Sequence, residues 1–300
     1  MKNQDTFSGC HPVVNLAYFA LVLAFSMVLM HPVCLCISLA AAVACRQSLG
    51  GRKAVRGSLL YLLPVATAAA AINVLFNHEG ATILTYLPTG NPLTLESIAY
   101  GFAAAVMLSS LFIWFTCFSH VMTSDKLVYL FGRIIPALSL VISMTLRFVP
   151  RFKAQFQVVA DAQRCVGRDT ESGKPVNRLK NAITVFSIMV TWSLENGSET
   201  ADSMKSRGYG LPGRSAFAIY TFDSRDRLVL VWLGSCAVFL LSGALTGRFQ
   251  WQYYPIMKGA ELSFMTAVMY VVYLALCLTP VFLSWQEHRA WKKLQEETGK

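Results

Sequence analysis

The stretch that decides the fold reads Arg-Phe-Val-Pro-Arg-Phe at residues 147–152, Asp-Ala-Gln-Arg-Cys-Val-Gly at 161–167 and Ser-Met-Lys-Ser-Arg-Gly-Tyr at 203–209. It is charged and helix-prone, and it lies inside an otherwise apolar chain. Two helices in it are expected to end alike, with arginine near the last turn and glycine as the stop. Glycine there accepts the left-handed conformation, and arginine suits the negative end of the helix dipole. We therefore expect a basic helical insert that binds a soluble partner, anchored by the rest of the chain.

The composition indicates the class of protein. Of 300 residues, 55% are hydrophobic and only 14% are charged, and the mean hydropathy is +0.48. Soluble domains contain about 25% charged residues, and several apolar runs here approach the roughly 20 residues that cross a bilayer. We predict an all-α, polytopic helical membrane protein with a cytoplasmic helical insert between its spans.

The net charge of +10 indicates which partners the protein binds. Basic loops mark the cytoplasmic side of a membrane protein and meet anionic lipid. The loops of this chain lack the alternation of aromatic and basic residues with which proteins bind single-stranded nucleic acid. The lipid bilayer is therefore an expected partner, and nucleic acid is not.

The N-terminal region, residues 1–126, is expected to consist of membrane segments. Its first apolar run, 13–45, is interrupted by His31-Pro32, and proline kinks or breaks a helix. The run is either two short segments or one long kinked helix, and we favour a hairpin. Residues 46–56 hold four basic side chains and no acid, which marks a cytoplasmic loop. Two further spans are expected at 58–76 and 97–120. The residues between them, 77–96, are expected to form an external loop.

The middle region, residues 127–227, is expected to hold cytoplasmic and interfacial helices. Residues 127–149 are apolar but include Arg133 and Arg147, and an arginine near the centre of a lipid-facing helix costs about 2.5–3.5 kcal/mol. This part is either a span with interior-facing or snorkelling arginines or a long helix at the membrane face. The basic residues that follow favour the second interpretation. Further helices are expected at 150–166, 178–194 and 195–207.

The C-terminal region, residues 228–300, is expected to return to the membrane. Spans are predicted at 228–246 and 262–285, with a short external loop between them. The tail after them is basic, so we expect it on the cytoplasmic side.

The chain offers little chemistry of its own. Gly167 to Lys174 resembles a phosphate-binding loop, but five residues separate its glycines where the motif has four, and Pro175 replaces the required serine or threonine. The five histidines form no His-Glu-x-x-His motif, and the eight cysteines contain no Cys-x-x-Cys pair. We therefore expect no catalytic residue, no cofactor and no metal site.

The paired helix ends are the most informative signal. One arginine-glycine helix end is also typical of an ordinary solvated loop. Two such helices about forty residues apart, both expected on the cytoplasmic side, are more specific. Because a guanidinium forms a rigid fork that fits carboxylates, the two ends are suited to acidic grooves on two soluble subunits.

These residues resemble the transmembrane T component of energy-coupling factor (ECF) transporters, which import vitamins and metals into bacteria. The resemblance runs over most of the chain and is carried by five segments: His11-Pro12, 91–97 (Asn-Pro-Leu-Thr-Leu-Glu-Ser), 147–151 (Arg-Phe-Val-Pro-Arg), 161–164 (Asp-Ala-Gln-Arg) and 204–209 (Met-Lys-Ser-Arg-Gly-Tyr). It implies a non-catalytic, multi-pass subunit of the bacterial cell membrane. It also implies two ABC-type ATPase subunits and a small membrane S component that captures the substrate.

The resemblance also implies where the ATPases dock. The family carries two Ala-Arg-Gly motifs at the ends of cytoplasmic coupling helices, each taken to engage one ATPase. Ser206, Arg207 and Gly208 match the second motif. The first departs, since aligning its glycine to Gly167 leaves Cys165 and Val166 on the alanine and arginine positions.

This departure leaves two interpretations open. Either Arg164 substitutes for the missing arginine, or the first ATPase contact is weaker. The expected ATPase-coupling residues are therefore Arg164, Gly167, Ser206, Arg207 and Gly208.

Alternative functions are a self-sufficient secondary transporter, a conventional ABC permease and a membrane anchor without a transport role. Few charged groups lie in the predicted spans, and no internal repeat is visible. Both features disfavour a secondary transporter.

Overall fold

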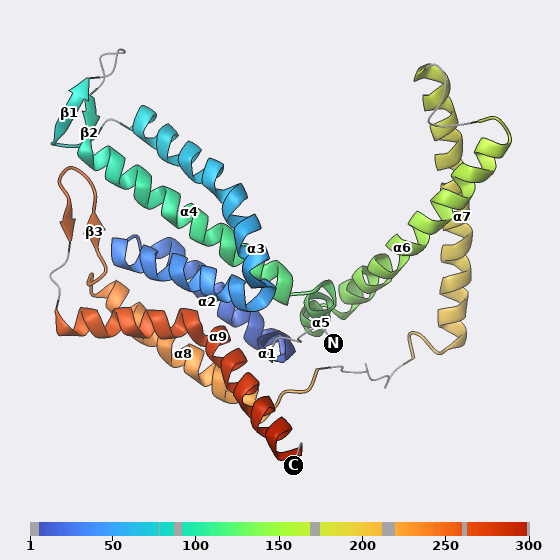
Figure 1. Cartoon of the computed structure of the whole chain (residues 1–300). Helices are drawn as coiled ribbons and strands as arrows, with labels where there is room; N and C mark the ends of the chain where they lie inside the picture. The colour runs from blue at the N-terminus through green and yellow to red at the C-terminus, as the bar shows by residue number, and fades with distance from the viewer. Residues whose placement is uncertain are drawn as a thin grey trace. The chain divides into compact units, whose positions relative to one another are not determined.

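The computed structural model describes residues 6–77, 79–86, 92–168, 175–211, 220–259 and 263–298. The chain divides into two compact units (Figure 1). Unit 1 comprises residues 1–127 and 220–300, and unit 2 comprises residues 128–219. Both units are built from helices, so the prediction of an all-α membrane protein is confirmed.

Unit 1 contains the helices that are long and apolar enough to cross a membrane. Among the described residues these are α3 (Pro32–Phe76), α4 (Leu95–Val121), α8 (Ser224–Leu245) and residues 264–286 of α9 (Phe264–Thr298). The shorter α1 (Thr6–Gly9) and α2 (Pro12–Val28) precede them. Two small antiparallel hairpins join the helices, β1 (Ile83–Tyr86) with β2 (Pro92–Thr94) and β3 (Trp251–Gln252) with β4 (Lys258–Gly259).

The first apolar run folds as the predicted hairpin and not as one kinked helix. Helices α2 and α3 begin in the same way, with a histidine at the N-cap and a proline directly after it. Nδ1 of His11 accepts a hydrogen bond from the backbone N–H of Val13, and Nδ1 of His31 accepts one from Val33, each at 3.3 Å. Proline is favoured at the first helical position, where its missing N–H is not needed. The proline at 32 therefore starts a new helix.

The basic stretch 46–56 is not a loop, which corrects one expectation. Helix α3 runs through it, with a single break at Gly51, whose φ is 71°. The segments predicted as separate spans before and after this stretch are therefore two arms of one element. Glycine accommodates this angle because it has no Cβ, so the direction of the chain changes at one residue.

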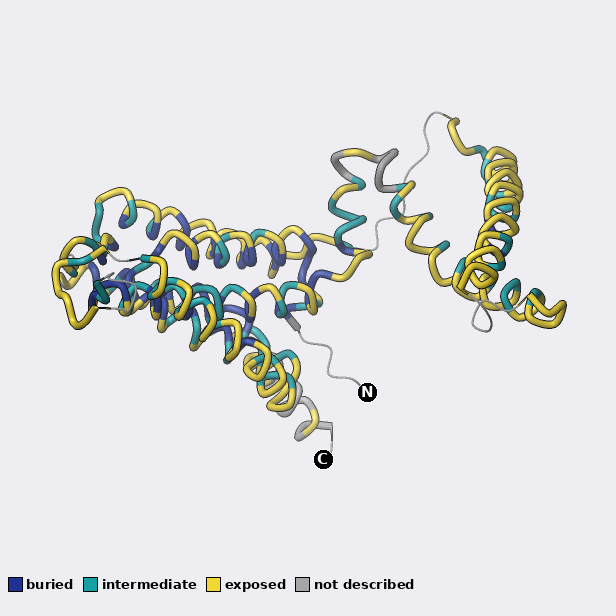
Figure 2. Tube along the Cα trace, turned by 90° about the horizontal axis from the view of Figure 1, so that it is seen from above, coloured by how far each residue is buried: buried dark blue, intermediate teal, exposed yellow. Residues whose placement is uncertain are grey.

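The core of unit 1 joins its helices through buried aromatic and hydroxyl groups. The Tyr18 hydroxyl on α2 donates to the carbonyl oxygen of Cys277 on α9 at 2.8 Å. Trp114 Nε1 on α4 donates to Ser38 Oγ on α3 at 3.2 Å, and Ser38 is bonded to Ser26 on α2 at 2.8 Å. Figure 2 shows this interior as buried residues along the inner sides of the helices. Helix α9 is thus an integral part of unit 1.

Unit 2 is an antiparallel pair of long helices, α6 (Pro136–Cys165) and α7 (Pro175–Ser206), preceded by α5 (Ser124–Ile134), which begins in unit 1. The predicted helix boundaries were wrong here. Helix α5 ends at Ile134, and a new helix, α6, begins at Pro136. Helix α6 then continues through Pro150, although an internal proline removes one helical hydrogen bond. Helix α7 contains no break near residue 195, so the two helices expected there are one.

The N-terminal segment around Ser8 and His11 hydrogen-bonds to residues near the two points where the chain leaves and re-enters unit 1. The ammonium group of Lys126 donates to the carbonyl oxygens of Ser8 at 2.5 Å and Val121 at 3.0 Å. The backbone N–H of His11 donates to the carboxylate of Asp226 at 3.3 Å. Lys126 precedes the exit from unit 1, and Asp226 follows the return of the chain. One short segment therefore contacts both crossings.

The ammonium group of Lys126 makes these hydrogen bonds in a buried environment, which disfavours a charge. Its side chain is 5% exposed, and this burial lowers the pKa of its ammonium group. A buried charge is tolerated when oxygen acceptors replace its water. The two carbonyls and the Ser8 hydroxyl, at 3.4 Å, supply those acceptors.

We predict that Lys126→Met destabilises the protein by about 1–3 kcal/mol, because it leaves these buried acceptors without a donor. Thermal unfolding of the purified chain in detergent, followed by tryptophan fluorescence, measures the change. Lys180→Met is the matched control, since Lys180 is exposed on α7. Equal midpoints for the two variants would contradict this role of Lys126.

Candidate interaction site at two helix ends

The end of α6 is closed by a glycine cap of the Schellman type. The backbone N–H of Gly167 donates to the carbonyl of Arg164 at 3.0 Å, and that of Arg168 donates to the carbonyl of Gln163 at 2.9 Å. Gly167 has a φ of 78°. A Cβ at this position would meet no atom within 4 Å, so the backbone angle and not lack of space requires glycine.

The end of α7 repeats this arrangement bond for bond. Gly208 donates to the carbonyl of Lys205 at 2.9 Å, and Tyr209 donates to the carbonyl of Met204 at 3.0 Å. The φ of Gly208 is also 78°. The two helix ends therefore share one backbone conformation, and their residues correspond one to one when counted from the glycine.

This correspondence places the predicted residues. Arg207, directly before the glycine, corresponds to Val166, and Ser206 corresponds to Cys165. Arg164 corresponds to Lys205 and so does not occupy the position of Arg207. Successive helical residues are about 100° apart, so Arg164 and a residue two positions later lie on different faces.

The cap alone does not mark a site, because α8 ends in the same way. Gly247 there has a φ of 73°, and its N–H donates to the carbonyl of Ala244 at 3.2 Å. Exposed side chains also precede Gly247, but they are Leu245 and Thr246, whereas the ends of α6 and α7 expose cationic groups. Arg164, Cys165 and Val166 are exposed on α6, as are Ser206 and Arg207 on α7.

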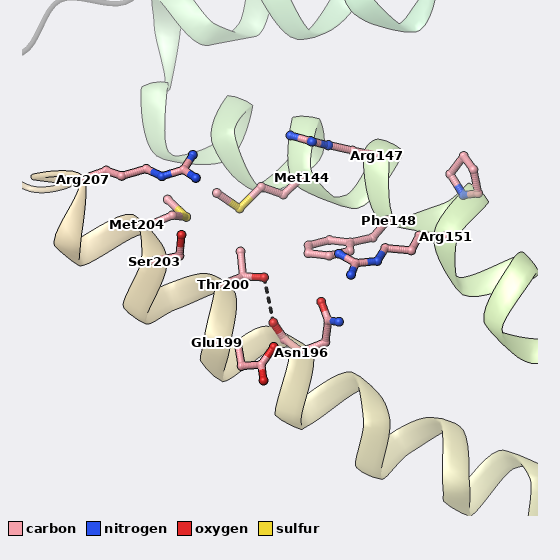
Figure 3. Close-up of a pocket in the computed structure, with 11 residues that line it drawn as sticks. Met144, Arg147, Phe148, Arg151, Asn196, Glu199, Thr200, Ser203, Met204 and Arg207 are labelled. Carbon is pink, nitrogen blue, oxygen red and sulfur yellow. Dashed lines mark hydrogen bonds between the residues drawn. The ribbon is translucent and has the colours of Figure 1, made fainter.

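A groove of about 770 Å³ between α6 and α7 surrounds Arg207. Arg207 extends from the end of α7 toward Met144 on α6, and Arg147 and Arg151 line the same groove from α6 (Figure 3). Glu199 supplies a carboxylate on the α7 side. The groove thus has a net positive lining, which suits a carboxylate or another anion.

Arg147 and Arg151 were not among the predicted coupling residues, although both lie in a segment that carries the family resemblance. Their spacing of four residues places them on one face of a helix, and this was the available signal. Their proximity to Arg207 depends on the antiparallel pairing of α6 with α7, which the ring contact of Phe152 with Trp192 marks at a centroid distance of 5.3 Å. That pairing is not visible in the sequence.

Helix α7 also presents an apolar stripe that unit 2 does not cover. Leu179, Ile183 and Phe186 follow helical spacing and are exposed, Phe186 by 69%. The residues of α7 that are buried are Val185 and Met189. Phe186 lines a second groove of about 370 Å³ together with Phe152 and Phe156 from α6, among others.

The profile of the cobalt transport protein family CbiQ matches residues 8–217, which include both glycine caps. An energy-coupling factor transporter transmembrane protein of Listeria monocytogenes is 30% identical over 109 residues, 36% of this chain and 39% of the relative. The proteins of the same description from Lactococcus lactis and Brevibacillus brevis are 29% identical over 105 residues and 33% identical over 95 residues. These two alignments cover 35% and 31% of this chain and 40% and 36% of the relatives. The chain thus spans about two fifths of the length of the relatives that it matches.

The cap at the end of α7 predicts that replacing two different glycines by alanine changes the stability of the helix in opposite directions. Gly208→Ala forces a Cβ into the left-handed region at a cost of about 1–2 kcal/mol, so amide exchange in the last turn of α7 should accelerate. Gly197→Ala, inside the same helix and with open space around it, should stabilise α7 by about 0.5–1 kcal/mol. Hydrogen–deuterium exchange with mass spectrometry measures both, and a shift in the same direction would contradict the cap.

Proposed function

Because the chain belongs to the cobalt transport protein family CbiQ, we propose that it is the transmembrane coupling subunit of an ECF importer. Its apolar helices and its family make it a multi-pass protein of the bacterial cell membrane. In the proposed complex, two ABC-type ATPase subunits bind its cytoplasmic face, and a small membrane S component captures a vitamin or a transition-metal ion. The chain itself contributes no catalytic residue.

The observation that carries this proposal is the pair of matching helix ends. Two helices of one unit end in the same cap, and each end exposes cationic side chains. Cationic groups at a helix C-terminus also face the negative end of its dipole, which holds them there. A pair of such ends fits two soluble subunits better than it fits one.

We assign the following roles to the predicted residues. Gly167 and Gly208 end the helices so that the last turn is free to enter a groove. Arg207 pairs with a carboxylate of one ATPase, and Arg147 and Arg151 strengthen the positive potential around it. Ser206 is small enough for a close approach, and Arg164 supplies a cation in the last turn of α6.

A rigid connection is needed to pass motion from the ATPases to the S component. Helices α6 and α7 are 30 and 32 residues long, so each spans about 45 Å or more at 1.5 Å per residue.

The apolar stripe of α7 that includes Leu179 and Phe186 offers a surface for a hydrophobic partner. We assign this surface to the S component.

The composition of the complex tests the proposal directly. Purification of the chain from its native membrane in mild detergent, followed by intact-complex mass spectrometry, should give two ATPase subunits and one small membrane protein. The identity of the small protein would then indicate the substrate. A chain that purifies alone, under conditions in which other ABC complexes survive, would refute the coupling role.

We further predict that Arg207→Glu lowers ATP-dependent uptake at least tenfold and leaves membrane insertion unchanged, because a glutamate repels the carboxylate that the arginine pairs with. Uptake in cells and the amount of chain in the membrane are measured together. Lys258→Glu is the control, since it makes the same charge reversal at an exposed residue outside unit 2. Normal uptake by Arg207→Glu would exclude the assigned role.

A further inference from the structure

The bend of α3 concentrates positive charge that nothing on the same helix balances. Helix α3 contains four cationic side chains and no aspartate or glutamate over its 45 residues. All four cations lie close to the break at Gly51: Arg46, Arg52, Lys53 and Arg56. The side chains of Arg52, Lys53 and Arg56 are exposed, and they make no hydrogen bond or ion pair with any described residue.

The first of these cations lies beside the bend and lacks an acceptor. A Cβ on Gly50 would come within 3.2 Å of Nη1 of Arg46, so the guanidinium extends along the helix to the residue before the break. Nε of Arg46 is buried and has no hydrogen-bond partner among the described residues. Because buried polar atoms of native proteins are nearly always hydrogen-bonded, this nitrogen indicates an acceptor that the chain itself does not supply.

The cations after the bend share one side of the helix. Arg52 and Arg56 are four residues apart, and Lys53 and Arg56 are three apart, and both spacings bring side chains together on a helix surface. Like charges at these spacings repel one another. A bound anion would relieve this repulsion, and the fork of an arginine side chain fits a phosphate group in particular.

The same side of the helix continues as an apolar surface. Leu60 and Leu63 lie four and seven residues after Arg56, and they are 75% and 70% exposed. They belong to an arm of α3 that is apolar enough to lie in a membrane. Cations followed by leucines along one helix match the order of groups in a phospholipid, whereas a soluble anion would use only the cations.

We propose that the bend of α3 is a binding site for one anionic phospholipid of the cytoplasmic leaflet. The phosphate accepts hydrogen bonds from the arginines of the bend, and an acyl chain lies along Leu60 and Leu63. Basic side chains next to a membrane helix attract anionic lipid in general. The site proposed here is specific, because it needs Arg52 and Arg56 and not merely a positive charge. It involves no ATPase or S component, so it does not rest on the proposed function.

The first experiment measures lipid binding by the purified full-length chain. The chain in detergent is titrated with phosphatidylglycerol and, separately, with phosphatidylcholine of the same acyl chains, and retained lipid is counted by intact-mass spectrometry. Both lipids contain a phosphate, but only phosphatidylglycerol has a net charge. One phosphatidylglycerol per chain should be retained at a concentration about tenfold lower than phosphatidylcholine requires. Equal retention of the two lipids would overturn the inference.

The second experiment asks whether the bend is the site. Arg52→Gln/Arg56→Gln should weaken phosphatidylglycerol binding about tenfold without a change in the thermal unfolding midpoint, since both residues are exposed. The matched control Lys180→Gln/Lys258→Gln removes two charges at exposed residues elsewhere and should bind as the wild type does. An equal effect of the two double variants, whether a loss or none, would show only a general attraction and would overturn the inference.

The third experiment distinguishes a lipid from a soluble anion. Leu60→Asn/Leu63→Asn keeps every charge and should weaken phosphatidylglycerol binding. Glycerophosphoglycerol, which is the headgroup without acyl chains, inorganic phosphate and a short oligonucleotide should each fail to displace the lipid at equal concentration. Displacement by any of them, or normal binding by the asparagine variant, would assign the bend to a soluble anion and overturn the proposal of a lipid.

Discussion

The constraint on which the structure depends is that lipid offers no hydrogen bond to a peptide group. The chain must cross the bilayer as helices that satisfy their own backbone, and each interruption needs a local solution. Histidine side chains cap α2 and α3 at residues 11 and 31, and Gly51 turns α3 within one residue. Such solutions leave few polar groups for function in unit 1. Among the described residues, the exposed cationic groups lie mainly in the basic stretch of α3, at the start of α8 and in unit 2.

Hydropathy and proline position predicted most of unit 1, because the length of an apolar run and the loss of one N–H are local properties. The hairpin at His31-Pro32 follows from them. Proline was a poorer guide in unit 2, where Pro136 starts a helix and Pro150 lies inside one. A proline ends a helix only when its neighbours do not compensate for the missing hydrogen bond. That compensation depends on packing, which the sequence does not display.

The candidate site also has one part that the sequence predicts and one part that it does not. Glycine after a basic last turn predicted the caps at Gly167 and Gly208, since the left-handed angle is a property of one residue. The groove around Arg207 was not predictable, because Arg147 approaches it from a helix about sixty residues earlier. The correspondence of Val166 with Arg207 also required the observed hydrogen bonds, which fix where each helix ends.

Burial explains why unit 2 is suited to partners. Among its residues whose burial is described, only Val185 and Met189 are buried, so the pair of helices has almost no core of its own. Long helices without a core are held weakly by their own packing, and exposed apolar residues such as Phe186 add a free-energy cost in water. Contact with the proposed partner subunits would remove both penalties. The chain therefore keeps its core in unit 1 and exposes in unit 2 the surface on which we propose that other subunits bind.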